Sequence, residues 1–345
     1  MDERIAEILS GQEAWVVGGA VRDRLLGRPL VDVDVACADP RDAAHRFATR
    51  FGGAAFPLSD RHGAWRVASA GSKETVDFTP LPNGIDADLA TRDFTFNAMA
   101  VSVDGGEDRD PHGGRADLAA RIVRSVTDRV FVDDPLRLLR AVRLEGELGF
   151  RMDERTEGLA RESASLVGRP AGERILGELE RLSAAGYRRL DELGLLDPLG
   201  GSLDGPVDAL DDSSFRLVAV FGQRLSALPI SRSLARYATA LLRATPPPDA
   251  SARSVHRFRR GTEPWALHAL AFLGADELAG AVEESRRRDP AEPLVRGDEL
   301  GLAPGPEIGR ILALIEEERA AGTISTRDEA LALARTQAEA GGGSA

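Results

Sequence analysis

The chain has 345 residues, of which 43% are hydrophobic and only 5% aromatic, and its formal net charge is −12. The length suffices for two or three domains, the apolar content excludes a largely disordered chain, and the acidic excess argues against non-specific nucleic-acid binding. No apolar run reaches the roughly 18 residues of a membrane span, so we expect no membrane partner. The single cysteine, Cys37, and a charged N-terminus without an apolar core favour a cytoplasmic protein.

The first segments alternate between strand and helix. Ala14–Val17 and Val31–Ala36 are predicted to be short apolar strands, joined by a helix at Ala20–Leu26 that ends at Gly27. Further along, the pattern predicts a helix at Pro40–Phe51 and strands at Trp65–Ser69 and Thr75–Phe78. This part of the chain is therefore predicted to be a small α/β or α+β unit.

A glycine pair, Gly18 and Gly19, lies where the first strand turns into the helix. Glycines allow backbone N–H groups to approach phosphate oxygens, and a helix start adds partial positive charge. Arg22 follows one turn later, where its guanidinium can reach the same phosphates. Taken alone, the pattern equally fits an ordinary tight strand–helix turn.

Two aspartates, Asp32 and Asp34, interrupt the valine-rich second strand. Because strand side chains alternate between faces, both carboxylates should lie on one face, which is suited to Mg²⁺. Asp is depleted in strands, so this pair is more suggestive than a loop pair would be. Asp77 repeats the apolar–acid–apolar pattern and is a candidate third carboxylate.

A polar segment, residues 91–100, follows these strands. Its Arg92 is a candidate for neutralising phosphate or holding a base edge, and Asn97 for contacting a ribose or the backbone. Asp93 is expected to pair with Arg92. Without the other motifs, an ordinary polar turn would explain the segment.

Beyond about residue 128 the periodicity becomes helical. Asp134–Leu148 is predicted to be a helix on which Asp134, Arg137, Arg140 and Arg143 form one stripe. Asp134 and Arg137 together offer acceptors and donors that match a base edge, and the remaining arginines can meet phosphates. A solvated face with internal ion pairs is the alternative.

The rest of the chain is predicted to be helical. The expected helices are Gly172–Ser183, Tyr187–Leu193, Phe215–Leu225, Glu307–Ala320 and Thr326–Ala338, with a loop at Thr245–Ser251 and a flexible end at 341–345. Two arginine clusters, at 253–260 and 286–288, are candidates for RNA contact or for a solvated surface.

Taken together, these motifs resemble the class II tRNA nucleotidyltransferase and bacterial poly(A) polymerase family of the polymerase β superfamily. The resemblance covers nearly the whole chain and is weakest between about Pro206 and Asp289. The matching segments are residues 18–34, Arg92–Ala98, Asp110–Gly114, Asp133–Arg143, Gly172–Leu179, Leu302–Gly309 and Ile324–Ala330.

This resemblance implies an α+β protein with a small head of mixed or antiparallel sheet and helices, followed by a helical neck, body and tail. We expect these parts at residues 1–127, 128–190, 191–290 and 291–345. The head would hold Mg²⁺ on Asp32 and Asp34, with Asp77 as a further catalytic candidate. The implied nucleotide-binding residues are Gly18, Gly19, Arg22, Arg92, Asn97, Asp134, Arg137, Arg140 and Arg143. Asp134 and Arg137 would select C or A.

The resemblance further implies an enzyme that adds CCA to the acceptor end of tRNA from CTP and ATP. This sequence departs from the family pattern at Thr91, Asp133 and Leu144, where arginine, glutamate and phenylalanine are usual. The segment Thr79–Leu89 is shorter than in many members that add the terminal A. The signature of an appended phosphohydrolase domain is absent, so we expect no such activity.

Several alternatives stay open at this point. Within the same enzyme class these are a CC-only enzyme, an A-only enzyme and a poly(A) polymerase, the last disfavoured by the acidic charge. From other classes they are a catalytically inactive RNA-binding module and a small-molecule nucleotidyltransferase. The sequence does not predict the oligomeric state.

Overall fold

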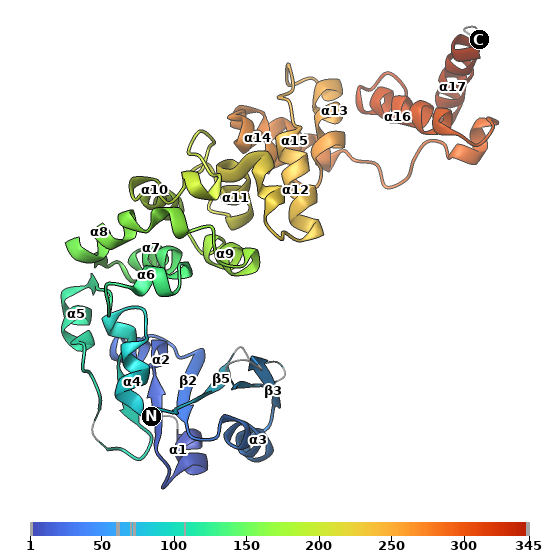
Figure 1. Ribbon diagram of the computed structural model, residues 1–345. Helices are drawn as coiled ribbons and strands as arrows, with labels where there is room; N and C mark the ends of the chain where they lie inside the picture. Colours follow the sequence, from blue (N-terminus) through green and yellow to red (C-terminus); the bar gives the residue numbers. More distant parts are fainter. Residues whose placement is uncertain (1–2, 60–62, 70, 72–73, 107, 343–345) are drawn as a thin grey trace. The chain divides into compact units, whose positions relative to one another are not determined.

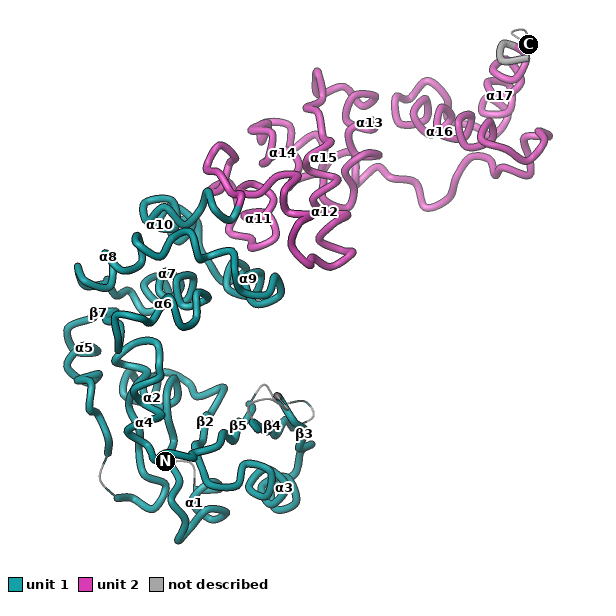
Figure 2. Tube along the Cα trace, in the orientation of Figure 1, with its two compact units in different colours: residues 1–199 teal, residues 200–345 magenta. Residues whose placement is uncertain are grey.

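The computed structural model describes residues 3–59, 63–69, 71, 74–106 and 108–342. The chain divides into two compact units, residues 1–199 and residues 200–345 (Figure 2). The head and neck expected as separate parts thus lie in one unit, and the unit boundary falls near the expected end of the neck. The finer division into four parts stays a prediction.

Unit 1 begins with a six-stranded sheet in the order β3-β4-β5-β2-β1-β6 (Figure 1). The pair of β2 and β5 is parallel, and the other neighbouring strands of this sheet are antiparallel. This arrangement confirms the predicted mixed sheet. The strands are β1 (Ala14–Val17), β2 (Asp32–Cys37), β3 (Ala54–Ser59), β4 (Ala64–Ala68), β5 (Thr75–Pro80) and β6 (Ala100–Ser102).

The sheet packs one face against helices, and this packing orients β2. Val33 and Val35 of β2 are buried in a core that also contains Phe47 and Phe78. Phe47 belongs to α3 (Pro40–Phe51), which begins as predicted because Asp39 accepts a hydrogen bond from the Asp42 N–H. Since alternate residues of a strand face opposite sides, burying the valines turns the aspartates of β2 to the other face.

Helices cover the sheet and lead from it into the rest of unit 1. Those around the sheet are α1 (Glu3–Leu9), α2 (Gly19–Leu25), α3, α4 (Ile85–Ala90), the 3-10 turn η1 (Thr95–Asn97) and α5 (Gly114–Ala120). The remainder of unit 1 is α6 (Val130–Asp133), α7 (Leu136–Leu148), α8 (Glu154–Glu162), η2 (Ala164–Leu166), α9 (Gly172–Leu179), α10 (Ala184–Glu192) and η3 (Asp197–Leu199). Two short strands, β7 (Ile122–Val123) and β8 (Arg151–Met152), pair in parallel.

The regular elements in the described part of unit 2 are all helices, as predicted. Its elements are α11 (Ser213–Phe221), η4 (Gly222–Ala227), α12 (Arg232–Leu242), α13 (Ala252–Thr262), α14 (Ala266–Leu273), η5 (Asp276–Leu278), α15 (Ala279–Arg287), η6 (Gly297–Leu300), α16 (Pro306–Ala320) and α17 (Arg327–Gly342). Within the described ranges, no helix combines the length and the apolar character needed to cross a bilayer.

The structure differs from the sequence-based predictions at three places. Asp134 is not part of the helix predicted at Asp134–Leu148, because the residue before a proline is disfavoured in the α conformation and α7 begins after Pro135. Gly341 and Gly342 continue α17 rather than forming a flexible end, and residues 343–345 of that prediction lie outside the described residues. Strand β3, which pairs with β4 at the edge of the sheet, was not predicted.

Candidate active site

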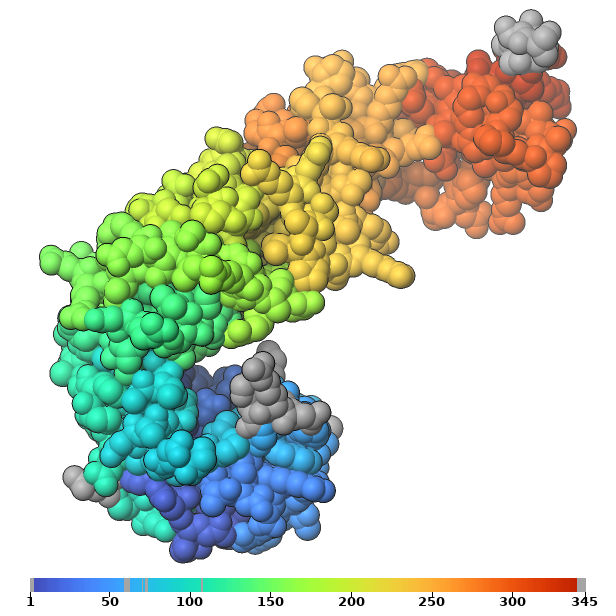
Figure 3. All heavy atoms as spheres, in the orientation of Figure 1, coloured from blue at the N-terminus to red at the C-terminus, as the bar shows by residue number. Residues whose placement is uncertain are grey.

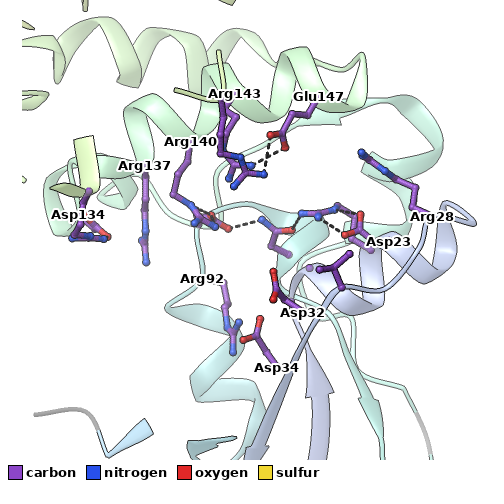
Figure 4. Close-up of a pocket in the computed structure, with 18 of the residues that line it drawn as sticks. Asp23, Arg28, Asp32, Asp34, Arg92, Asp134, Arg137, Arg140, Arg143 and Glu147 are labelled. Carbon is purple, nitrogen blue, oxygen red and sulfur yellow. Dashed lines mark hydrogen bonds and ion pairs between the residues drawn. The ribbon is translucent and has the colours of Figure 1, made fainter. Parts of the chain in front are cut away.

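A cavity of about 670 Å³ opens in unit 1 between the sheet and the helices α7 and α9 (Figure 4). It brings together residues that are more than 100 positions apart in the sequence. Of the predicted site residues, Asp77 alone is outside the lining. The predicted residues that line the cavity are Gly18, Gly19, Arg22, Asp32, Asp34, Arg92, Asn97, Asp134, Arg137, Arg140 and Arg143.

Both aspartates of β2 face this cavity, as the alternation of strand side chains predicted (Figure 4). The Asp32 carboxylate accepts a 2.6 Å hydrogen bond from the Thr75 hydroxyl on the neighbouring strand. Asp34 lies deeper, with the Arg92 side chain near it (Figure 4). Two carboxylates side by side on a rigid strand make an oxygen site of the kind that Mg²⁺ takes.

Burial raises the pKa of the Asp34 carboxyl above its ordinary value. The positive charge of Arg92 opposes this effect, while the negative charges of Asp77 and Asp32 add to it. The charged form of Asp34 is therefore costly to bury, and a bound cation would relieve that cost.

We expect Asp34→Asn to raise the thermal stability of the metal-free protein at neutral pH, because it removes a disfavoured charge. The pKa of Asp34 is higher in the folded than in the unfolded chain, so ionisation destabilises the fold above the folded pKa. The gain in melting temperature should be full at neutral pH and shrink as pH falls toward the ordinary aspartate pKa. Thermal unfolding followed by circular dichroism across pH measures this. A variant no more stable than the parent at pH 7 would contradict the prediction.

Asp77 is held differently from the other two acids. It lies opposite Asp34 in the parallel pairing of β2 and β5. Both of its oxygens accept hydrogen bonds from Arg66, each at 2.7 Å. Within the described residues there is no cluster of three or more His, Cys, Asp or Glu arranged to hold a metal ion. Its role as a third carboxylate thus stays a prediction, and the arrangement favours Asp32 and Asp34 as a pair.

Gly18 is required by the local backbone. Its φ of 71° lies in the left-handed region, and a Cβ atom there would stand 2.9 Å from Nη1 of Arg92. The turn therefore brings the backbone close to both Arg92 and Asp34. There is thus no room for a side chain at position 18, and the phosphate-binding role of the turn stays a prediction.

A chain of polar contacts links this turn to helix α7 (Figure 4). Arg22 donates to both oxygens of Asp23, at 2.9 and 2.8 Å, and to the Asn97 side-chain oxygen at 2.7 Å. The Asn97 amide donates to Asp93, which also accepts from Arg140 at 2.9 Å. These contacts within the protein fix the orientation of Arg22 and Asn97.

Asp93 is the buried centre of that chain. Burial by itself would raise the pKa of Asp93, but Arg140, Asn97 and the Phe94 N–H stabilise the anion and lower the pKa below its ordinary value. Its partner is Arg140 of α7 rather than Arg92, which the sequence had suggested and which pairs with Asp88 at 2.8 Å. The Asp93 carboxylate therefore holds the Arg140 side chain in its position in the cavity lining.

Asp134 and Arg137 line the far side of the cavity (Figure 4). One oxygen of Asp134 accepts from the Leu136 N–H at 3.1 Å, and the other accepts from Arg174 of α9 at 2.9 Å. Arg137 donates to the Thr91 carbonyl at 2.7 Å and makes no ion pair among the described residues. The pair thus presents oriented acceptors and donors to the cavity.

Arg143 is the most buried arginine of this helix. It donates to Glu178 at 2.6 Å and to Glu147 at 2.7 Å. With both neighbours negative, Arg143 serves the packing of α7 on α9 as well as the positive lining of the cavity.

Six charged residues that also line the cavity were not among the predicted site residues: Asp23, Arg28, Asp93, Glu147, Arg174 and Arg181. Arg174 and Arg181 both lie within the helix predicted at Gly172–Ser183, but neither was named as a site residue; in the structure α9 ends at Leu179, before Arg181. Their spacing of seven residues, two helical turns, could have placed them on one face. Arg28 lies beside Gly27, and nothing in its local pattern distinguishes it from a surface arginine.

Comparison with known proteins agrees with this geometry. The family described as Poly A polymerase head domain matches residues 14–124. The CC-adding tRNA nucleotidyltransferase of Geobacter sulfurreducens is 33% identical, over 93% of this chain and 91% of that protein. The A-adding tRNA nucleotidyltransferase of Deinococcus radiodurans is also 33% identical, over 94% of this chain and 96% of that protein.

Solved structures share the fold at lower identity. The Thermotoga maritima CCA-adding enzyme complexed with tRNA has a TM-score of 0.75 and is 23% identical, covering 97% of this chain and 95% of that one. A CCA-adding enzyme in complex with CTP has a TM-score of 0.81 at 22% identity, covering 98% and 95%. The likeness over nearly the whole chain shows that this protein is a nucleotidyltransferase of the class II tRNA nucleotidyltransferase family.

Proposed function

We propose that this enzyme adds C, C and then A to the 3′ end of tRNA, using CTP and ATP. The observation that carries the proposal is the cavity of unit 1. Its lining contains the carboxylates of Asp32 and Asp34, several arginines, and Asp134 and Arg137, which we propose read the base. A tRNA substrate agrees with the cytoplasmic location expected from the sequence.

Asp32 and Asp34 fit a divalent metal ion, which enzymes of this family generally use. We propose that the ion is Mg²⁺. The site offers two carboxylates and no third protein ligand among the described residues, which suits an ion that completes its shell with substrate phosphates and water. When bound, such ions assist in-line attack of the tRNA 3′-hydroxyl on the α-phosphate and departure of pyrophosphate.

The chain's own residues would bind and select the nucleotide. The backbone at Gly18 and Gly19 and the guanidinium of Arg92 would contact the triphosphate, whose negative charge suits this arginine-rich lining. Asp134 and Arg137 would hydrogen-bond to the base edge, so the protein itself serves as template. The polar contacts of Asn97 and Asp93 would keep the neighbouring arginines of the cavity in place.

A CC-only enzyme is the second candidate, and two observations favour it. Only four residues, Leu81–Gly84, separate β5 from α4, in the segment where the resemblance expects a longer loop for terminal A addition. One of the relatives covering nearly the whole chain is named CC-adding. Another relative that covers nearly the whole chain is named A-adding, which favours the A-only alternative.

Three tRNA substrates separate these outcomes: one lacking CCA, one ending after the first C, and one ending after CC. With CTP and ATP we expect all three to finish as CCA, read by gel electrophoresis of labelled tRNA. Products that stop at CC in every case would establish the CC-only enzyme, and extension of the third substrate alone would establish the A-only enzyme. Long adenosine tails would indicate a poly(A) polymerase. No incorporation, with tRNA binding retained, would indicate an inactive RNA-binding module.

A further inference from the structure

The arginine clusters at 253–260 and 286–288, which the sequence made candidates for RNA contact, are largely neutralised inside unit 2. Arg257 of α13 donates to Glu317 of α16 at 2.9 and 2.6 Å. Arg286 of α15 donates to Glu263 at 3.0 and 2.8 Å. The other paired arginines of these clusters are Arg253, Arg259, Arg287 and Arg288. Most of the charge in these clusters therefore stabilises contacts within and between the helices of unit 2.

On helix α12, in contrast, the arginines are not neutralised by acidic residues of the described part of the chain. Arg232 and Arg236 on the helix and Arg243 at its C-cap are not buried. Among the described residues none of the three forms an ion pair or a side-chain hydrogen bond, and α12 itself contains no acidic residue. Figure 3 shows this part of the chain, in yellow, at the surface of the molecule. Three uncompensated positive charges on a protein of net charge −12 call for an explanation.

The three arginines share one face. At 3.6 residues per turn, positions 232, 236 and 243 fall within about 40° of one another and span about 16 Å along the axis. The buried residues of α12 are Leu234, Tyr237, Ala238 and Leu241, and the same geometry centres them on the opposite side. The side chains between the arginines on the exposed side are small, at Ala235 and Thr239, so a bulky polyanion can approach the helix.

We propose that this arginine face of α12, formed by Arg232, Arg236 and Arg243, binds the phosphate backbone of the RNA substrate. Guanidinium groups bind phosphates bidentately, and release of counterions from the RNA supplies the free energy. Such contacts position the substrate without reading its sequence. The inference rests on the proposed function for the identity of the RNA, but it assigns the contact to residues outside the cavity.

The test compares two triple variants of the full-length enzyme that lose the same charge. R232Q/R236Q/R243Q removes the arginine face, and R287Q/R288Q/R310Q removes three exposed arginines that are paired with Glu284 and Glu307. tRNA binding is measured by fluorescence anisotropy between about 50 and 300 mM salt. We expect the first variant to bind tRNA about tenfold or more weakly near 0.1 M salt and to flatten the slope of log K against log salt by about two to three. The second variant should keep the slope of the parent.

Steady-state kinetics separates a binding role from a structural one. The KM for tRNA should rise in R232Q/R236Q/R243Q, while kcat at saturating tRNA and the KM for CTP stay unchanged. The single variants should each lower the salt slope by about one, which keeps the test decisive if the triple variant does not fold.

Equal tRNA binding by the two triple variants, or a larger loss in the paired-arginine variant, would overturn the proposal. Failure of the proposed function gives a different pattern. In that case the parent enzyme would extend none of the three tRNA substrates, while the loss of RNA binding confined to the α12 variant would still support the arginine face.

Discussion

Replacing either Asp32 or Asp34 with alanine is expected to lower the rate of pyrophosphate release by about 10³-fold or more, which corresponds to roughly 4 kcal/mol of transition-state stabilisation. The two carboxylates lie on one face of β2 and face the cavity, so each variant would remove half of the protein's contribution to the proposed metal site. The measurement is pyrophosphate release with saturating tRNA and CTP at several Mg²⁺ concentrations.

Asp86→Ala is the matched control for this experiment. Asp86 is an exposed aspartate in the first turn of α4, outside the cavity lining, and its loss should leave the rate within about twofold, as is usual for surface substitutions. Mg²⁺ should also raise the melting temperature of the parent more than that of the Asp34 variant, because a ligand that binds the folded state stabilises it. Turnover within a few-fold of the parent in both active-site variants would show that the metal assignment is wrong.

Asp134→Ala is expected to weaken the choice of base more than the chemistry. Asp134 lies at the wall of the cavity, away from the β2 carboxylates, and its carboxylate is oriented by Arg174 and by the Leu136 N–H. Losing one member of a bidentate reading pair costs about 1–3 kcal/mol, so discrimination against UTP and GTP should fall by about 10- to 100-fold. The ratio of kcat/KM values for CTP, ATP, UTP and GTP measures this effect.

The control is Asp128→Ala, an exposed aspartate of the same region that pairs with Arg155 and lies outside the cavity. Its nucleotide preference should match that of the parent. An Asp134 variant that loses the same factor for all four nucleotides would refute the reading role, because selectivity would then be set elsewhere.

Local pattern in the sequence was enough to predict the parts of the site that depend on one element. Alternation along β2 placed Asp32 and Asp34 on one face, and the buried valines of the core confirm that orientation. The glycine pair predicted a turn that only a residue free to adopt positive φ can make at position 18. The change from strand to helix periodicity predicted the helical remainder, whereas the mixed sheet was implied by the resemblance to the family.

The partners of the charged side chains came only from the tertiary structure. The sequence suggested that Asp93 pairs with its neighbour Arg92, whereas the fold gives it Arg140, 47 residues away. Arg257 likewise finds Glu317 at a separation of 60 residues. Such pairs depend on which helices meet, and local periodicity carries no information about that.

The structure also differs from the sequence-based predictions at the ends of helices. Asp134 was expected on a helical stripe, but Pro135 moves the helix start beyond it, and its carboxylate instead caps the first turn and meets Arg174. By itself, the sequence determined which residue types and strand faces could do the chemistry. Only the tertiary structure decided which arginines are left without a counter-charge, because charge neutralisation is a property of assembled helices rather than of any single segment.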